Sequence, residues 1–231
     1  MSCAHTQLEA ALDRWSECHW HLHQMEAAYH DPDPFRYSLN SFIRAVKEVP
    51  QILKMELQNH PLYRSVLKGI IDSTKDNELL GKLGRHRDFI VHRGMLELAS
   101  SGQMGTTEGR GFKIGIGFNV APFESSDEAY ERYKEACRKN PVFRGAFGPD
   151  CDSAPYLRRE WKVSELGDVE LLELCVSAWR SLGEAISSIV QAFGGESLDL
   201  SLPCRHDPEK VKTRVFSQSD FFRTVDGEPD A

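Results

Sequence analysis

Apolar residues recur three or four positions apart along the first part of the chain, the spacing that places them on one face of a helix. This pattern predicts one long helix over roughly residues 5–29 and a second from Phe35 to Leu53. The Asp-Pro-Asp-Pro run at 31–34 separates the two, because proline suits the first turn of a helix and disfavours helix in the residue before it. Pro50 is expected to bend or interrupt the second helix.

Further along, the pattern predicts two shorter helices, the second from Asn77 to His92, and then it changes character. Apolar and polar residues alternate from Gly111 to Phe123, as they do in a half-buried strand. Helical spacing returns from Leu172 to Phe193 and ends at two glycines. Composition and spacing predict the segments in between: a loop rich in Gly, Ser and Thr at 100–111, a polar helix at 126–139, an irregular stretch at 140–155 and a second strand at 156–163.

The order of these elements predicts a mainly α fold. Helices from two separated parts of the sequence are expected to form an up-down helical bundle, which carries a small β-containing insertion. We expect residues 1–231 to form a single domain, with residues 100–163 as the insertion. A chain of this length buries a core without needing disulfides.

The composition is that of an ordinary globular protein, with 40% hydrophobic and 27% charged residues. No window approaches the roughly 18 apolar residues of a membrane-spanning helix, and no signal-peptide pattern is visible. The six cysteines are scattered without a C-x-x-C pair, which favours free thiols and a cytoplasmic location. A net charge of −7 argues against a broad basic face for nucleic acid, but it leaves room for a local positive site at Arg85, His86, Arg87 and Arg93.

The run Arg87-Asp88-Phe89-Ile90-Val91-His92 is the strongest candidate for chemistry. At 100° per residue Arg87 falls in the apolar sector of its helix, where a buried guanidinium needs a partner. That partner is either a carboxylate from another helix or an anion bound in a cleft. Asp88 and His92 lie four residues apart, so Asp88 can fix the tautomer of the imidazole and leave its other nitrogen free for proton transfer.

This run resembles the Arg…His signature of the HEPN superfamily, and the long first helix and the start of the second fit the same pattern over roughly residues 5–95. The resemblance implies a HEPN-like helical homodimer in which two motifs face each other, without metal or cofactor. Many members are metal-independent endoribonucleases that act as toxins or antiviral defence effectors. RNA as substrate, and an antitoxin or other regulatory protein, are the implied partners.

The resemblance also implies a role for each residue of the site. His92 would act as general acid and base on the ribose hydroxyl or the leaving oxygen, and Arg87 would bind the scissile phosphate. Asp88 would orient His92 or contact the partner chain. Arg85 and Arg93 would add contacts to the substrate.

Two other interpretations stay open. The first is a non-catalytic HEPN-like dimeric module that binds a nucleotide or a protein partner, with Arg87 in a structural ion pair. The second is a helical scaffold unrelated to RNA, in which the motif is a coincidence. The long apolar stripes on the first and last helices favour a dimer.

His19, His21 and His23 form a second polar cluster, on the predicted first helix. His19 and His23 share a helical face, but His21 points elsewhere and no H-E-x-x-H pattern or cysteine partner accompanies them. We therefore assign no metal site and interpret His19 as a packed, hydrogen-bonded residue. A lesser alternative places His19 or Glu26 in the same cleft as Arg87.

Overall fold

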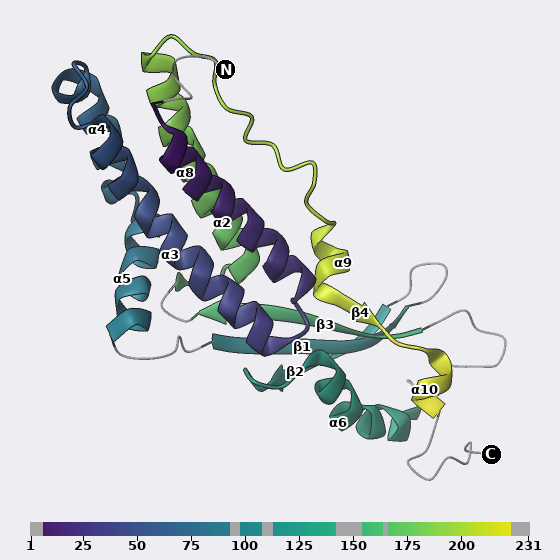
Figure 1. The fold of residues 1–231 in the computed structure, drawn as a ribbon. Coiled ribbons are helices and arrows are strands. Elements are labelled where there is room, and N and C mark those ends of the chain that lie inside the picture. The colour runs from purple at the N-terminus through teal and green to yellow at the C-terminus, as the bar shows by residue number, and fades with distance from the viewer. Residues whose placement is uncertain (1–6, 93–97, 108–112, 142–153, 164–165, 223–231) are drawn as a thin grey trace. The chain divides into compact units, whose positions relative to one another are not determined.

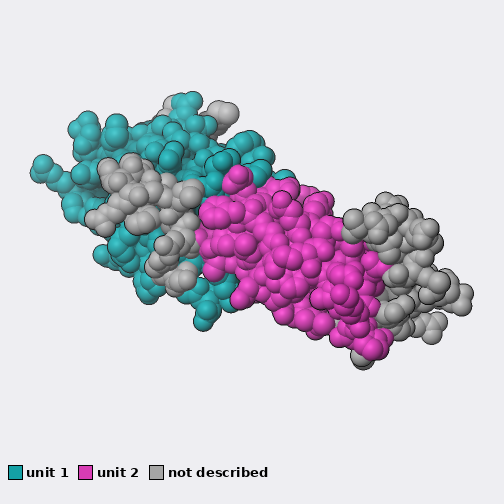
Figure 2. All heavy atoms as spheres, turned by 90° about the horizontal axis from the view of Figure 1, so that it is seen from below, with its two compact units in different colours: residues 1–27, 34–97, 162–205 teal, residues 28–33, 98–161, 206–231 magenta. Residues whose placement is uncertain are grey.

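Figure 1 shows the computed structural model, which describes residues 7–92, 98–107, 113–141, 154–163 and 166–222. For residues 89–92 it describes the backbone but not the side chains. The chain forms two compact units, drawn in different colours in Figure 2. A helical unit comprises residues 1–27, 34–97 and 162–205, and a sheet unit comprises residues 28–33, 98–161 and 206–231.

The helices of the helical unit come from the parts of the sequence before and after residues 98–161. These are α2 (Glu9–Ala27), α3 (Pro32–Leu57), the π-helical turn η1 (Tyr63–Leu67), α4 (Lys68–Asp76), α5 (Glu78–His92) and α8 (Leu171–Ala192). In Figure 1 α2 and α8 lie side by side. Trp15 stacks on Trp179 with ring centroids 4.4 Å apart. Each indole N–H donates to the backbone carbonyl of the other residue, at 3.0 and 3.3 Å, and this pair joins the two helices.

The predicted apolar stripes form the core of the helical unit. Leu8 and Met25 on the N-terminal side, and Leu172 and Ile186 on α8, are fully buried. Burial of such side chains stabilises the fold by about 2 kcal/mol each. From the sequence, these stripes favour a dimer, but the chain's own helices cover them. The dimer itself is not tested by this structure and stays a prediction.

Pro50 lies inside α3, which continues to Leu57, so the proline does not end the helix. Leu53 and Leu57 follow it and are 0% and 1% exposed. Packing of these side chains into the core offsets the cost of a proline in the helix interior, because tertiary burial outweighs local helix propensity.

The sheet unit contains a four-stranded sheet in the order β2-β1-β3-β4. β1 pairs with β2 and β3 with β4, both antiparallel. The strands are β1 (Leu98–Thr107), β2 (Lys113–Val120), β3 (Ala154–Val163) and β4 (Thr213–Val215), and the helices of this unit are α6 (Ser126–Lys139), α9 (Pro208–Lys212) and α10 (Gln218–Phe222). A capping box between Ser125 and Glu128 begins α6. Its buried Tyr130 belongs to one apolar cluster with Met104 and Leu157 of the sheet.

The prediction of a loop at 100–111 was wrong for residues 100–107, because residues 98–107 form β1, and residues 108–111 lie outside the described residues. Gly102 pairs with Phe118 across the sheet, and a Cβ at Gly102 would come within 2.8 Å of that ring. The glycine therefore serves close strand packing and not a flexible turn. Met104 and Thr106, next on the same face, are each 1% exposed.

Arg159 is the centre of a buried polar network in the sheet unit, with 0% of its surface exposed. Its Nε donates to Ser100 Oγ at 2.8 Å, and Nη1 and Nη2 donate to the carbonyls of Glu124 and Ala121 at 2.7 and 3.3 Å. The guanidinium lies 3.7 Å above the ring of Trp161. Burial lowers the pKa of Arg159 to about 10, so the side chain stays charged at neutral pH.

The predicted fold class is confirmed in its coarse form: the protein is mainly helical and carries a small antiparallel sheet. Within the described part of the chain, none of the helices combines the length and the apolar character that crossing a membrane requires.

Candidate metal centre

The motif that the sequence singled out lies on α5, and its described polar side chains pair with one another and with α3. Both carboxylate oxygens of Asp88 accept from Lys47 Nζ at 2.6 Å. Arg87 Nη1 donates to Asp88 Oδ1 at 3.2 Å, and the Arg87 side chain is 31% exposed. Hydrogen bonding from Lys47 is the main reason that the pKa of Asp88 is lowered. Asp88 thus contacts the neighbouring helix.

Of the other predicted site residues, only Arg85 has a described side chain. Arg85 is exposed and lines a hollow of about 330 Å³ between α3, α4 and α5, together with Lys47 and Lys75. The side chain of His92 and the whole of Arg93 lie outside the described residues. The structure therefore gives no geometry for an Arg87–His92 pair.

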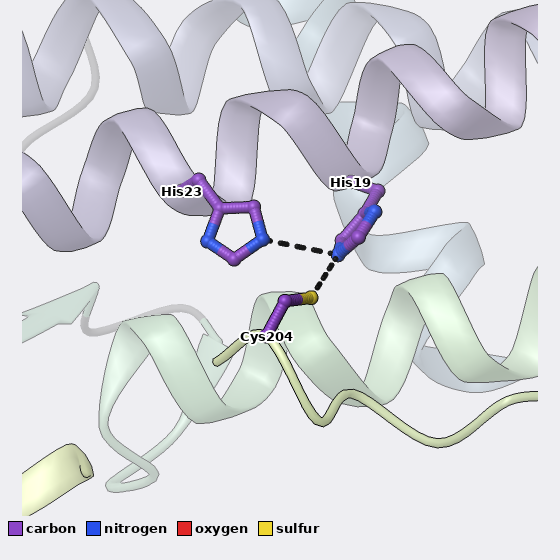
Figure 3. A group of neighbouring side chains, drawn as sticks. All are labelled: His19, His23 and Cys204. Carbon is purple, nitrogen blue, oxygen red and sulfur yellow. Dashed lines mark hydrogen bonds between the residues drawn. The ribbon is translucent and has the colours of Figure 1, made fainter. Parts of the chain in front are cut away.

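A different group of side chains converges on α2. His19 and His23 are four residues apart, so the helix places them on one face. Cys204 meets them from a turn that precedes α9, closed by a hydrogen bond from the Arg205 amide to the Leu202 carbonyl at 3.1 Å. Figure 3 shows the three side chains pointing toward one another.

Two of the three distances among the candidate ligand atoms are close to those of a tetrahedral metal site. His19 Nε2 lies 3.2 Å from His23 Nε2 and 3.3 Å from Cys204 Sγ, and all three candidate atoms lie within 4.8 Å of one another. With zinc–nitrogen bonds of about 2.05 Å and zinc–sulfur bonds of about 2.3 Å, tetrahedral angles put two nitrogens about 3.3 Å apart and a nitrogen and a sulfur about 3.6 Å apart. The two measured edges match these values to within a few tenths of an ångström.

Glu26 fixes the orientation of His23. The Nδ1 of His23 lies 3.1 Å from Glu26 Oε2, and an ionised carboxylate only accepts, so Nδ1 carries the proton. The lone pair of His23 is then on Nε2, which points at His19. A carboxylate behind a histidine in this way is the usual outer partner of a metal-binding imidazole.

Arg205 in turn holds the Glu26 carboxylate, whose side chain is only 2% exposed. Arg205 Nε donates to Glu26 Oε1 at 3.1 Å. Its two terminal nitrogens donate to Glu173 of α8, at 3.1 and 2.6 Å. The chain Glu173–Arg205–Glu26–His23 therefore links α8, the turn and α2 behind the ligand atoms.

His19 is held neutral by its surroundings. Burial lowers its pKa, and the neighbouring His23 lowers it further, although Glu26 opposes both. The ring lies against Trp179, with centroids 5.4 Å apart. A neutral imidazole at physiological pH is the form that binds metal, so little proton release from His19 is required.

Cys204 differs from the other described cysteines. Cys18, Cys137 and Cys175 are buried, and burial raises the pKa of each thiol above its usual value. Cys204 is exposed. It is therefore the described thiol that a metal ion or a solution reagent can reach.

Sequence reasoning noted that His19 and His23 share a helical face but assigned them no metal site, and it missed Cys204, which is 185 residues from His19 in the chain. His21, the third histidine of the sequence cluster, is not part of the group. It packs edge-on against Trp20 and lies 3.5 Å from Glu17. The residue that does complete the group stands in an irregular segment, where neither periodicity nor a motif marks it.

Comparison with known proteins gives one family match. Residues 3–108 match a family described as Bacteriophage lambda protein ea47. Neither the curated proteins nor the solved structures contain a match. The chain is thus similar to this phage family over its N-terminal part, which includes His19 and His23 but not Cys204.

This match corrects the HEPN assignment, because the family found is that of ea47 and not a HEPN family. The endoribonuclease function, the HEPN-like binding module and the toxin or defence role depended on that assignment, and they are withdrawn with it. The signature was misleading because any helix with an arginine and a histidine a little over one turn apart satisfies it. RNA and a regulatory protein, as partners, stay predictions that rested on the same resemblance.

Proposed function

We propose that this protein binds a divalent transition-metal ion of the zinc class through His19, His23 and Cys204. The observation that carries the proposal is the convergence of two imidazole nitrogens and one thiol sulfur, with His19 Nε2 3.2 Å from His23 Nε2 and 3.3 Å from Cys204 Sγ, close to tetrahedral edge distances. A hydrogen bond between two side chains does not require a third side chain to point at the same place, whereas a metal ion does.

The donor set selects the kind of metal. Nitrogen and sulfur donors suit Zn²⁺ and its neighbours in the transition series, whereas Mg²⁺ and Ca²⁺ require oxygen ligands. Glu26 has its two oxygens occupied by His23 and Arg205, so it serves as an outer partner. Three protein ligands leave a fourth tetrahedral position for water or another small ligand.

The proposal is tested by titrating the apo-protein with Co²⁺, which reports its ligands through absorption spectra. We expect one equivalent to give visible d–d bands of tetrahedral intensity and a near-ultraviolet thiolate-to-cobalt band. Zn²⁺ should displace the cobalt and bleach both bands, because zinc binds nitrogen and sulfur sites more tightly.

Variants of the three ligands assign the site. Cys204→Ser should remove the thiolate band, and His19→Ala and His23→Ala should each weaken binding by more than about 100-fold, beyond the effect of outer-shell changes. The matched control is His206→Ala, which removes an exposed histidine two residues from Cys204 that is not in the group. Equal binding by all four variants would refute the proposed site.

A further inference from the structure

The segment that carries Cys204 runs as an irregular strap along the helical unit. We define the strap as residues 195–205, which follow α8 and contain no helix or strand. Figure 1 shows it as a long coil that returns past α8. Its backbone is held by few hydrogen bonds, and the Leu198 amide donates to Ser187 Oγ of α8 at 3.0 Å.

The middle of the strap packs closely on α8. A Cβ added at Gly183 would come within 2.5 Å of Leu200 Cδ2 and within 2.8 Å of the Trp15 ring. Glycine at this helix position therefore allows Leu200 to approach the helix backbone. The strap thus has a built seat on α8, although all of its residues are exposed or only half-buried.

The C-terminal end of the strap is where it reaches α2. Cys204 Sγ lies against His19, and Arg205 donates to Glu26. A metal ion bound by His19, His23 and Cys204 would join this end to α2 by coordination bonds. Without the ion, the same end is held by the ion pairs of Arg205 with Glu26 and Glu173.

We propose, resting on the proposed metal binding, that the ion fastens the strap to α2 and that hydroperoxides detach the strap from the ion by oxidising Cys204. The fastening is thus a metal clasp with one oxidisable ligand. Because both histidine ligands come from α2 and only the thiolate comes from the strap, loss of that single ligand detaches the strap from the ion.

The oxidation step involves hydrogen peroxide as the oxidant. The thiolate sulfur of Cys204 attacks one peroxide oxygen, a sulfur–oxygen bond forms and the oxygen–oxygen bond breaks. Sulfur loses two electrons, and the leaving hydroxide takes the electron pair and is protonated to water. The sulfenic acid that remains is a poorer metal ligand than the thiolate, so the ion loses its sulfur donor. A thiol reductant reverses the change through a mixed disulfide.

Hydrogen exchange at the Leu198 amide reports whether the strap is seated, because its acceptor, Ser187, belongs to α8. If unseating requires release of the ion, free Zn²⁺ at 100 times its dissociation constant should slow this exchange by about 100-fold. Peroxide should return the rate to that of the apo-protein and release one equivalent of zinc to a colorimetric chelator.

The decisive variant is Cys204→His, which supplies a nitrogen ligand that peroxide does not oxidise under the same conditions. It should keep zinc binding and zinc-dependent protection of Leu198, and it should lose the response to peroxide. Measurements are made in a Cys3→Ser/Cys151→Ser background, because those two cysteines lie outside the described residues.

The outcomes separate the two proposals. Failure of the wild type to bind zinc would refute the proposed function. Zinc binding that leaves Leu198 exchange unchanged would refute the clasp while the metal site stands. Peroxide release that persists in Cys204→His would show that another group is the oxidised one and would overturn the redox part. Loss of the response in Cys204→His alone supports the whole proposal.

Discussion

The helical unit and the sheet unit each contain a polar network that ties distant segments together, and the two networks use their polar atoms differently. Around Arg159 each guanidinium nitrogen donates to a protein acceptor, and the ring of Trp161 covers its face. Around Glu26 the acidic and basic groups are also paired, but the two imidazole nitrogens and the Cys204 thiol face one another.

The difference teaches how a structural network can be told from a binding site. When donors match acceptors, as at Arg159, the network satisfies itself and stabilises the fold. When atoms that can each offer a lone pair converge on one point, as here, a group that accepts lone pairs can complete the cluster. The metal ion proposed above is such a partner. Four experiments test this contrast, and each is expected to have a smaller effect than the one before it.

Replacing Arg159 should cost the most stability. Arg159→Met leaves the buried Ser100 hydroxyl and two partly buried carbonyls without their donor, at about 1–3 kcal/mol each, so we expect a loss of about 4 kcal/mol in the free energy of unfolding. Urea denaturation followed by fluorescence measures it. The control is Arg158→Met, which breaks partly exposed ion pairs with Glu160 and Glu209 and should cost under about 1 kcal/mol. Similar losses for both variants would contradict a special role for Arg159.

The sheet-unit network should also make stability depend on pH through His30. Burial, and then the charges of Arg214 and Arg159, lower the pKa of His30 to about 4. Between pH 6.5 and 4 the unfolded chain therefore binds a proton that the folded chain does not, so stability falls as pH falls, by about 3 kcal/mol over that window. Denaturation at pH 7 and pH 4.5 measures this slope. His30→Asn should remove it, and an unchanged slope would exclude His30 as its source.

In the helical unit, Glu26→Gln should weaken zinc binding by about 10- to 100-fold, because the amide no longer holds the His23 proton with a full negative charge. Competition with a chromogenic chelator gives the affinity. Glu17→Gln is the control, since Glu17 lies on the same helix but pairs with Arg14 and His21. If both variants bind zinc as the wild type does, the outer-partner role of Glu26 is wrong.

The smallest effect is expected at the α5 motif. Asp88→Asn removes a surface ion pair with Lys47, both of whose members are partly exposed, so the unfolding midpoint should barely move. Cobalt binding should be unchanged as well. A large shift in either measurement would show that α5 contributes more than a surface contact, and it would reopen the question of a site there.

The helices could be predicted from the sequence because burial follows the helical period. The prediction of a helix at 126–139 matches α6, and that of 172–193 matches α8 to within a residue. The strand β1 was missed because its Gly, Ser and Thr residues have little apolar signal, and what makes it a strand is its pairing with β2.

The candidate site could be predicted only in part. The i,i+4 spacing of His19 and His23 is local and visible in the sequence, whereas the approach of Cys204 depends on where the strap lies on α2 and α8. That placement is decided by contacts such as Leu200 on Gly183, which have no periodic pattern to reveal them. The Arg87 motif shows the opposite error, in which a local pattern suggested chemistry that the family match does not support.

The stacked indoles of Trp15 and Trp179 provide intrinsic fluorophores next to the proposed metal site. His19 touches the same aromatic pair, its ring 5.4 Å from that of Trp179. A paramagnetic ion such as Co²⁺ at the site would quench the fluorescence of these indoles, whereas Zn²⁺, with a filled d shell, would not quench it. Occupancy of the metal site by Co²⁺ can therefore be followed by intrinsic tryptophan fluorescence, without a label.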